Sequence, residues 1–505
     1  MSQTTAAGSE TTPFHKAGPQ ADDAPSGRRW WILAMIGLAQ LMVVLDATIV
    51  NIALPSAQAD LGFSDGNRTW IVTAYSLAFG SLLLLGGRIA DLFGRKPAFL
   101  VGIGGFAVAS AIAGAAPNFE VLVTGRALQG LFGALLAPAA LSLLTTTFTD
   151  AKERAKAFGI FGAIAGSGAA VGLLLGGVLT EYLNWRWTLY VNLIIAVVAI
   201  VGGWLLLERT ERDRGAKLDV PGTVLVTAGL FGIVYGFSNA ESHDWSSPLS
   251  WGFLAAGTAL LTVFAWWQTK AAHPLLPLRV LLDRNRGASF AALLVASAGM
   301  FGVFLFLTYY LQLTLGFSAI QTGLAFLPMV ATLMVSATMS TTFLLSVVGP
   351  RIVVPLGMAL GAVGLFWLTA LGLDSSYVAN VLPPLLVTGL GIGLVMAPAM
   401  SVGTSGVATE DAGVAGASVN TMQQIGGSIG TPLLNTLAAG AATSYLVGRN
   451  PADKLVQAQA AMDSYTTAFM WSAVLFVTGA LITVLLFRPG VPTAADPDAA
   501  PTVHM

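Results

Sequence analysis

The sequence predicts an all-α integral membrane protein with 14 transmembrane helices, arranged as two pseudo-symmetric six-helix bundles and an inserted helix pair. Three observations support this fold class: the composition, the positions of Lys and Arg, and an internal repeat. The chain has 505 residues, of which 55% are hydrophobic and 10% are charged, and its mean hydropathy is +0.75. Soluble domains carry about 25% charged residues, so this composition is typical of a protein that crosses the membrane many times.

The apolar runs are long enough to cross a bilayer, because a helix of about 20 apolar residues spans the hydrocarbon core. We predict spans near residues 30–55, 70–90, 97–116, 121–147, 158–180, 187–207, 220–239, 251–269, 289–313, 322–345, 351–372, 380–403, 413–439 and 467–487.

Lys and Arg give the orientation of these spans. If the N-terminus is cytoplasmic, 19 of the 24 Lys and Arg lie in cytoplasmic loops and tails and four lie outside. The remaining one, Arg126, lies within a span. This bias predicts that both termini are cytoplasmic, and it supports an even number of spans.

A short repeat suggests how the spans are grouped. The segment 133–139 (GALLAPA) matches 393–399 (GLVMAPA) at a constant offset of 260 residues. The match joins the fourth span to the twelfth, which leaves two extra helices between two related halves. We therefore expect a disordered cytoplasmic tail (1–29), an N-terminal bundle (30–207), inserted helices with flanking loops (208–288), a C-terminal bundle (289–487) and a second disordered tail (488–505).

Several function classes are disfavoured. The net charge of −1 gives no sign of a nucleic-acid partner. The chain has no Cys, and its four His lie outside the spans, so the usual ligands of a membrane metal or haem site are missing. No ATP-binding GxxxxGK[ST] sequence occurs. We expect no metal and no cofactor.

Asp46 is a carboxylate in the second half of the first span. An ionised group at that depth costs about 3 kcal/mol or more unless it faces a polar cavity or a partner. Such a residue is a candidate functional site. The alternative is a protonated Asp that bonds a neighbouring helix.

Arg126 is the other ionisable residue within a span. Because an Arg side chain keeps its proton, it needs a carboxylate, carbonyl groups or water. A guanidinium favours the ionised form of a carboxylate and burial disfavours it, so a pair exposed to both influences can load and release a proton. Asp46 and Arg126 are therefore the candidate proton-coupling residues. A static ion pair, or an Arg126 that reaches toward one membrane face, remains the alternative.

The connection between the second and third spans contains glycines, one carboxylate and several cations. Gly94 suits a positive φ, and Asp91 could bond Arg95 or cap a helix. We predict that this connection is a conformational latch, although it could be no more than a positive-inside signal. The latch candidates are Gly87, Asp91, Gly94, Arg95 and Lys96.

Two further groups of residues are candidates. Glycines repeat at spacings of four in the span 158–180, where they allow another helix to approach closely; the motif comprises Gly168, Gly172, Gly176 and Gly177. Polar side chains in several spans could line a substrate cavity; they are Asn51, Gln129, Tyr309, Gln312, Asn420 and Gln424.

Five segments together resemble the major facilitator superfamily, in particular its fourteen-helix drug:proton antiporter branch (EmrB/QacA type). They are residues 45–55 (LDATIVNIALP), 87–96, 126–130, 310–312 and 420–427. The resemblance implies two six-helix bundles, an inserted helix pair and alternating access. It also implies that Arg126 takes part in proton coupling. The chain departs from the branch at Leu173, where the helix motif normally has Pro after Gly172, and at Leu92.

The predicted function is export of small amphipathic or cationic organic compounds, such as drugs and antibiotics, driven by the proton motive force. We expect a monomer in a bacterial-type plasma membrane, whose partners are its substrate, protons and lipid; a periplasmic or cell-wall adaptor stays open. The alternatives are a dedicated exporter of one endogenous metabolite (an antibiotic or siderophore) and a symporter. A membrane enzyme or sensor is disfavoured, because only Asp46 and Arg126 are ionisable at membrane depth and no large soluble domain is present.

Overall fold

The computed structural model describes residues 26–148, 150–208, 219–243, 246–272, 274–276, 278–407, 412–450 and 452–490. Within these ranges the regular secondary structure is helical, as predicted. Most of the two predicted tails lies outside the described residues.

The first six helices pack against one another. They are α1 (Ser26–Leu61), α2 (Asp65–Phe93), α3 (Arg95–Gly114), α4 (Phe119–Thr147), α5 (Ala151–Tyr182) and α6 (Trp187–Leu206). In this group α4 lies against α2 and α3, and α1 lies against α5 and α6.

The remaining chain forms a helix pair and a second group. The pair is α7 (Val220–His243) and α8 (Pro248–Gln268), followed by the short α9 (Leu278–Leu281). In the described part of the chain, the second group has six long helices. Three of them continue into or from short segments: α10 (Arg284–Tyr309) continues into η1 (Tyr310–Thr314), α11 (Ala319–Met339) continues into η2 (Ser340–Leu344) and α12 (Leu345–Val348), and α14 (Leu382–Thr404) follows η3 (Tyr377–Val381). The other three are α13 (Pro350–Leu368), α15 (Ala412–Leu446) and α16 (Lys454–Leu486).

The internal repeat coincides with equivalent packing in the two groups. Helix α4 carries the first copy and packs on the second and third helices of its group. Helix α14 carries the second copy and packs on α11 and α13, which are the second and third long helices of theirs.

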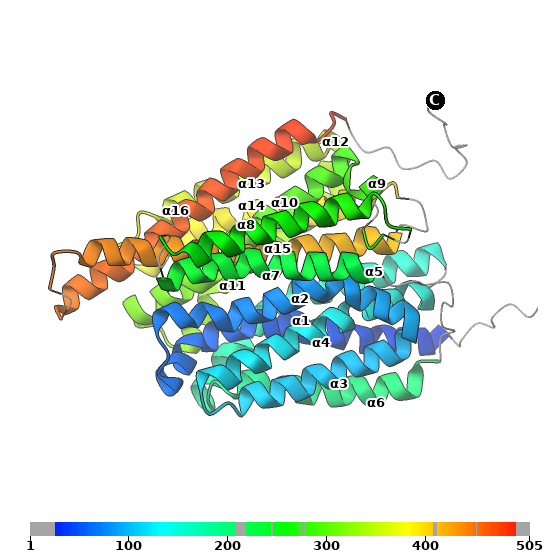
Figure 1. Cartoon of the computed structure of the whole chain (residues 1–505), viewed down its shortest axis with the longest axis horizontal. Helices are drawn as coiled ribbons and strands as arrows, with labels where there is room; N and C mark the ends of the chain where they lie inside the picture. Colours follow the sequence, from blue (N-terminus) through cyan, green and yellow to red (C-terminus); the bar gives the residue numbers. More distant parts are fainter. Residues whose placement is uncertain are drawn as a thin grey trace, which may run out of the picture.

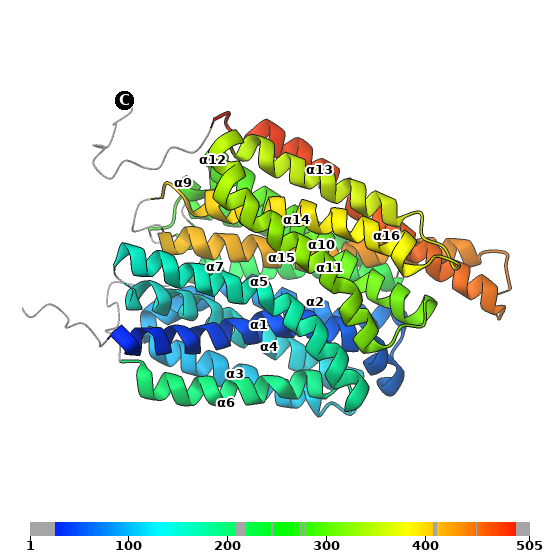
Figure 2. The same cartoon turned by 180° about the vertical axis from the view of Figure 1, so that it is seen from behind.

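The helices run roughly side by side, and the start of α1 and the end of α16 lie at the same end of the molecule, the end of the termini (Figures 1 and 2). The two groups meet where α5 packs on α11 and where α2 packs on α15, while α7 packs on α2 and α15. At the end opposite the termini, the turn between α15 and α16 extends beyond the other helices (Figure 1).

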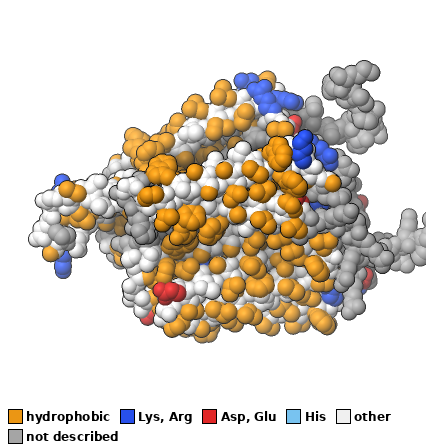
Figure 3. Space-filling view, viewed as in Figure 1, with side chains coloured by type: hydrophobic (Ala, Val, Ile, Leu, Met, Phe, Trp, Pro, Cys, Tyr) orange, Lys and Arg blue, Asp and Glu red, His pale blue; other side chains and the backbone are white. Residues whose placement is uncertain are grey.

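Among the described residues, 11 helices are long and apolar enough to cross a membrane. Helices α2, α5 and α15 are also long, with 29, 32 and 35 residues. Large hydrophobic side chains lie on the outer surface, for example Trp204, Val335 and Phe343. Figure 3 shows hydrophobic side chains spread over one face of the molecule, as expected for a surface in contact with lipid.

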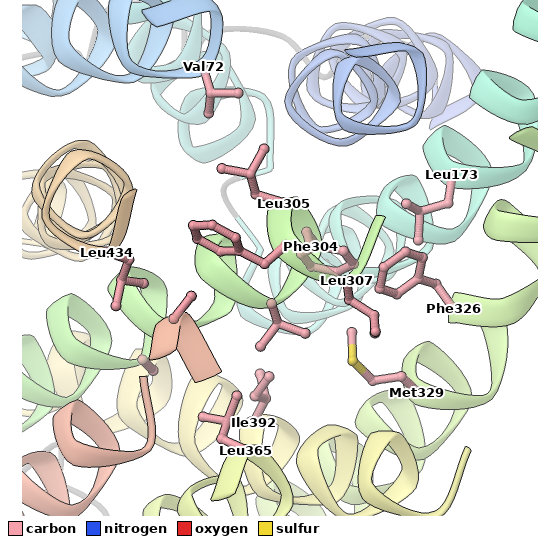
Figure 4. Close-up of a cluster of buried hydrophobic side chains, with 14 of the residues drawn as sticks. Val72, Leu173, Phe304, Leu305, Leu307, Phe326, Met329, Leu365, Ile392 and Leu434 are labelled. Atoms are coloured by element: carbon pink, nitrogen blue, oxygen red, sulfur yellow. The ribbon is translucent and has the colours of Figure 1, made fainter. Parts of the chain in front are cut away.

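The main buried apolar cluster joins both groups of helices (Figure 4). It includes Val72 of α2 and Leu173 of α5 from the first group, together with Phe304 of α10 and Phe326 of α11 from the second. Because lipid tails are as apolar as these side chains, close packing rather than the hydrophobic effect stabilises such contacts in a membrane.

Candidate functional site

The two ionisable residues predicted to pair are in direct contact. Arg126 of α4 donates from Nη1 to Oδ2 of Asp46 on α1, with an N–O distance of 2.5 Å. Both residues are fully buried, with 0% and 1% of Asp46 and Arg126 exposed. A buried ion pair is stable only when its remaining hydrogen-bonding groups are also satisfied.

Neutral amides satisfy the second carboxylate oxygen of Asp46. Gln129 Nε2 donates to Oδ1 at 2.9 Å, and Asn192 Nδ2 of α6 donates to the same oxygen at 2.8 Å. Ser110 of α3 accepts from both amides, at 2.7 Å from Gln129 and 3.3 Å from Asn192. The carboxylate is therefore enclosed by α3, α4 and α6, inside the first group of helices.

Arg126 is fixed by further contacts within the same group. Its Nε donates to the carbonyl oxygen of Ile71 at 3.1 Å, and its Nη1 donates to Gln129 Oε1 at 2.8 Å. The guanidinium carbon lies 4.5 Å from the ring centroid of Tyr75, so a cation–π contact adds to the ion pair. The hydroxyl of Tyr75 is buried and has no hydrogen-bond partner among the described residues.

Small residues bring the backbones of this site together. A Cβ atom on Gly130 would lie 2.3 Å from the carbonyl oxygen of Tyr75, so only a glycine lets α2 approach α4 this closely. In the same way, a Cβ atom on Gly125 would lie 2.7 Å from the Cβ atom of Ala113 on α3. Arg126 and Gln129 are three residues apart and share one face of α4, which directs both at α1.

The sequence analysis missed two of these residues. Asn192 is a lone amide in α6, one of the most apolar helices, and Ser110 is a lone hydroxyl in the apolar part of α3. An isolated buried amide in an apolar span was the available signal. Gln129, predicted to line a substrate cavity, lies in the ion-pair network instead.

The connection between α2 and α3 is the single residue Gly94, whose φ of +97° fits the predicted left-handed conformation. Beside it, Arg88 Nη2 donates to the carbonyl oxygen of Pro274 at 3.0 Å, across to the segment before α9. Lys96 Nζ donates to the carbonyl oxygens of Trp204, at 3.0 Å, and Leu207, which ties α3 to the end of α6. The side chain of Asp91 lies outside the described residues.

The glycine motif of α5 allows close helix contacts on two sides. Methyl groups on Gly168, Gly172 and Gly176 would meet Val44, Thr48 and Ile49 of α1 at 3.0 Å or less. Gly177 instead faces α11, where a methyl group would lie 2.7 Å from the Ala319 carbonyl oxygen. Leu173, in place of the family's Pro, is fully buried between α5 and α11.

Two of the predicted cavity residues join the two groups of helices. Tyr309 donates its hydroxyl to Gln58 Oε1 at 2.9 Å, and Gln312 Nε2 donates to the carbonyl oxygen of Ile52 at 3.1 Å. The guanidinium carbon of Arg68 lies 4.1 Å from the ring centroid of Tyr309. All these contacts lie at the end opposite the termini.

The other predicted cavity residues bond locally or pack between helices. Asn51 Nδ2 donates to the Ala47 carbonyl oxygen at 3.1 Å, and Asn420 Nδ2 donates to that of Gly416 at 3.4 Å. Gln424 packs against Gly80 of α2, and its buried Oε1 has no hydrogen-bond partner among the described residues. Within the described ranges, no group of three or more His, Cys, Asp or Glu is arranged to hold a metal ion.

Comparison with known proteins identifies the family. The family model described as the Major Facilitator Superfamily matches residues 36–431. The chain is 48% identical to a puromycin resistance protein of Streptomyces alboniger, over 92% of this chain and 93% of that protein. It is 37% identical to a cephamycin export protein of Amycolatopsis lactamdurans, over 90% and 92% of the two chains.

Solved structures share the fold at low sequence identity. An auto-inhibited peptide transporter of the POT family matches with a TM-score of 0.68 at 16% identity, covering 93% of this chain and 99% of that one. A bacterial homologue of the lysosomal transporter Spinster, in an inward-facing conformation, matches with a TM-score of 0.62 at 15% identity, covering 92% and 98%. The chain therefore belongs to the major facilitator superfamily and is a multi-pass membrane transporter.

Proposed function

We propose that the protein is a proton-coupled antiporter that exports small amphipathic or cationic organic compounds, antibiotics among them, from the cytoplasm. The observation that carries the proposal is the Asp46–Arg126 ion pair, buried in a membrane helix bundle and enclosed by neutral amides. A buried carboxylate costs free energy at membrane depth, and the need for a group that binds and releases a proton would explain its presence there.

Protonation of Asp46 would change the balance of the site. A neutral carboxyl group no longer compensates the charge of Arg126, which keeps its bonds to Ile71 and Gln129 but loses its counter-ion. An uncompensated buried charge is strongly destabilising, so proton binding would favour a rearrangement of the helices around the site.

Helix α1 connects this site to the second group of helices. Asp46 lies on the same helix as Ile52 and Gln58, which accept hydrogen bonds from Gln312 and Tyr309. A small movement of α1 upon protonation would therefore reach the contacts that close one end of the molecule. Such a link couples proton binding to alternating access through differential contacts in two states.

Relatives support the class of substrate. The similar proteins include a puromycin resistance protein, a cephamycin export protein and, at 35% identity over 82% of this chain, a tetracenomycin C resistance and export protein of Streptomyces glaucescens. These three names refer to different antibiotics, which favours export of organic antibiotics as the activity.

The second candidate function is export of a single antibiotic. The 48% identity to one resistance protein along 92% of the chain favours it. The number of compounds that exchange for protons separates the two candidates.

We also propose the finer organisation. Helices of 29 to 35 residues are about 44 to 52 Å long at 1.5 Å per residue, more than the bilayer core of about 30 Å, so α2, α5 and α15 would cross as well. That gives 14 spans, with bundles at 30–207 and 289–487, the inserted pair within 208–288, and both termini in the cytoplasm. The equivalent packing of α4 and α14 supports the two bundles. We expect a monomer without a cofactor.

The test uses purified protein in liposomes with an acidic interior and an internal pH dye. Puromycin, ethidium and neutral antibiotics are added to wild type and to Asp46→Asn. We expect at least one compound to drain the gradient with wild type and none with Asp46→Asn, because the amide cannot take up a proton.

Four outcomes are informative. Drainage by several unrelated compounds favours a multidrug exporter, and drainage by one favours a dedicated exporter. Equal drainage by Asp46→Asn would refute its role in coupling. No drainage by any compound with wild type, despite transport of radiolabelled puromycin, would argue against antiport.

A further inference from the structure

We propose that Asp46 receives its proton from the end of the molecule opposite the termini, along a path inside the N-terminal helices that is separate from the substrate route. This inference deepens the proposed function and depends on it, because it assumes that Asp46 exchanges protons. It rests on the walls of the carboxylate site, on a cavity beside Arg126 and on a polar stripe along α6.

The first observation is that Asp46 does not face the second group of helices. The side chains that bond its carboxylate come from α4 and α6, and Ser110 of α3 bridges two of them. The charged group that faces it is Arg126, and Tyr75 of α2 stacks on that guanidinium. A substrate held between the two groups of helices would therefore not touch the carboxylate in this conformation.

The second observation is a small cavity of about 10 Å³ whose inner wall is Arg126. Trp185, in the turn before α6, lines its other side, and the remaining lining is Thr188 of α6 and apolar residues such as Ala53 of α1. This volume is close to the space that one water molecule needs. The cavity therefore lies between the ion pair and Trp185, on the side of Arg126 toward the end opposite the termini.

The outer end of this cavity is close to the surface. Trp185 Nε1 donates to Oδ2 of Asp60 at 3.0 Å, and Arg186 Nη2 donates to the same oxygen at 3.0 Å. The carboxylate side chain of Asp60 is 51% exposed. Trp185 thus separates the cavity from an exposed acid that can collect protons from bulk water.

The third observation is the polar stripe of α6. Thr188 and Asn192 are four residues apart, so they lie on one face of the otherwise apolar α6, and Trp185 lies in the turn just before this helix. Asn192 is fully buried, donates to Asp46, and has an Oδ1 without a hydrogen-bond partner among the described residues. A buried unsatisfied acceptor one turn inward from the cavity marks a place for a water molecule.

The proton transfer needs no other reactant. A hydronium ion of the outer solution gives a proton to the water in the cavity as Trp185 moves and itself becomes water, and the cavity water passes one of its protons to the carboxylate of Asp46. The O–H bond forms at Asp46 as the O–H bond in the water breaks. Arg126 keeps its charge and stays bonded to Ile71 and Gln129.

The experiment follows the protonated carboxyl of Asp46 by infrared spectroscopy in substrate-free proteoliposomes. The C=O stretching band is assigned by its absence in Asp46→Asn, and the pH is lowered on one side of the membrane at a time. Ala53→Leu fills the cavity, Thr188→Val removes its hydroxyl at constant size, and Ala256→Leu on the exposed surface of α8 is the matched control.

We expect the band to rise faster when acid is added on the side opposite the termini. Ala53→Leu and Thr188→Val should each slow this rise by about tenfold, the effect of losing one hydrogen-bonding step, and Ala256→Leu should leave it unchanged. If Ala53→Leu fails to fold, Thr188→Val alone decides.

Two results would overturn the inference. Wild-type rates in both cavity variants would mean that the proton arrives from elsewhere, as would a faster rise with acid on the side of the termini. Absence of any band in wild type between pH 4 and 8 would instead refute the proposed proton exchange at Asp46, so the two failures are distinguishable.

Discussion

At the scale of single residues, Asp46 and Arg126 each cost free energy when buried as a charge, and only the opposite charge of the other residue offsets that cost. Both side chains are fully buried, and each would be an uncompensated charge without the other. Removing one partner of such a pair typically costs about 3–5 kcal/mol, whereas replacing both by neutral groups is often close to neutral. This asymmetry gives a prediction about stability that is independent of transport.

We expect Arg126→Gln to lower the thermal unfolding midpoint in detergent strongly at pH 8, and Asp46→Asn to lower it as well. The double variant Asp46→Asn/Arg126→Gln should recover most of the loss, because it leaves no unpaired charge. The measurement is intrinsic tryptophan fluorescence during heating. Additive losses in the double variant would mean that the two charges do not interact in the protein.

The sequence predicted this pair because charged residues are rare in apolar helices. Asp46 and Arg126 are the two ionisable residues predicted at membrane depth, so each is the expected partner of the other. It did not predict the neutral residues that complete the site. Ser110 and Asn192 are common types in a membrane helix, and their role depends on the angles at which α3 and α6 meet α1. Those angles follow from packing along the full helices, which one sequence does not give.

At the scale of helices, α1 and α5 pack closely because the glycines of α5 at their contact have no side chain. A methyl group at Gly172 would lie 2.0 Å from Thr48 Oγ1 and 3.1 Å from the Leu45 carbonyl oxygen. Part of the contact is backbone, which cannot move away as a flexible side chain can. The interface therefore depends on glycine at this position.

Gly172→Ala should destabilise the protein by about 1–3 kcal/mol through overpacking. Gly104→Ala on α3 is the control, since its methyl group would find its nearest neighbour at 4.0 Å, and it should be neutral or stabilising by about 0.5–1 kcal/mol. The readout is the thermal midpoint together with the monodisperse fraction on size exclusion. Equal effects of the two substitutions would contradict a specific role for Gly172.

The sequence also predicted this element well, because glycines four residues apart indicate a close helix contact whatever the partner. The partners themselves, α1 for three of the glycines and α11 for Gly177, came only from the structure. Boundaries were less certain: the span predicted at 158–180 corresponds to a helix from Ala151 to Tyr182. The prediction rested on the apolar run, and the polar ends of a helix that extend beyond the bilayer are not part of that run.

At the scale of the whole molecule, the two groups of helices are held together at the end opposite the termini. Tyr309 bonds Gln58, Gln312 bonds Ile52, and the backbone N–H of Ile320 donates to Glu181 Oε2 at 3.1 Å. These contacts must break if the transporter is to open at that end. They therefore set part of the balance between its two states.

The combined substitution Tyr309→Phe and Gln312→Leu should favour opening at that end. Because the natural chain has no cysteine, Leu173→Cys between α5 and α11 can report on it. We expect an impermeant maleimide to label this cysteine about tenfold faster in the combined variant, as the loss of one to two hydrogen bonds implies. Leu183→Cys, at a position that is 55% exposed, is the control whose labelling should not change.

The sequence predicted Tyr309 and Gln312 to line a cavity, since polar side chains in apolar spans need water or a substrate. In the structure they instead bond across the two groups of helices. Composition and spacing locate a polar residue along the membrane normal, but they do not tell which neighbour it faces. That choice depends on how the two groups sit against each other.

The turn between α15 and α16 extends beyond every other helix in Figure 1. Gly448 lies in this turn, with a φ of +75° and an exposed backbone. A transporter of this size with few residues outside the bilayer offers little for aligning particle images in electron microscopy. The hairpin is therefore the natural place to graft a rigid marker or an antibody epitope, because it extends beyond the packed helices.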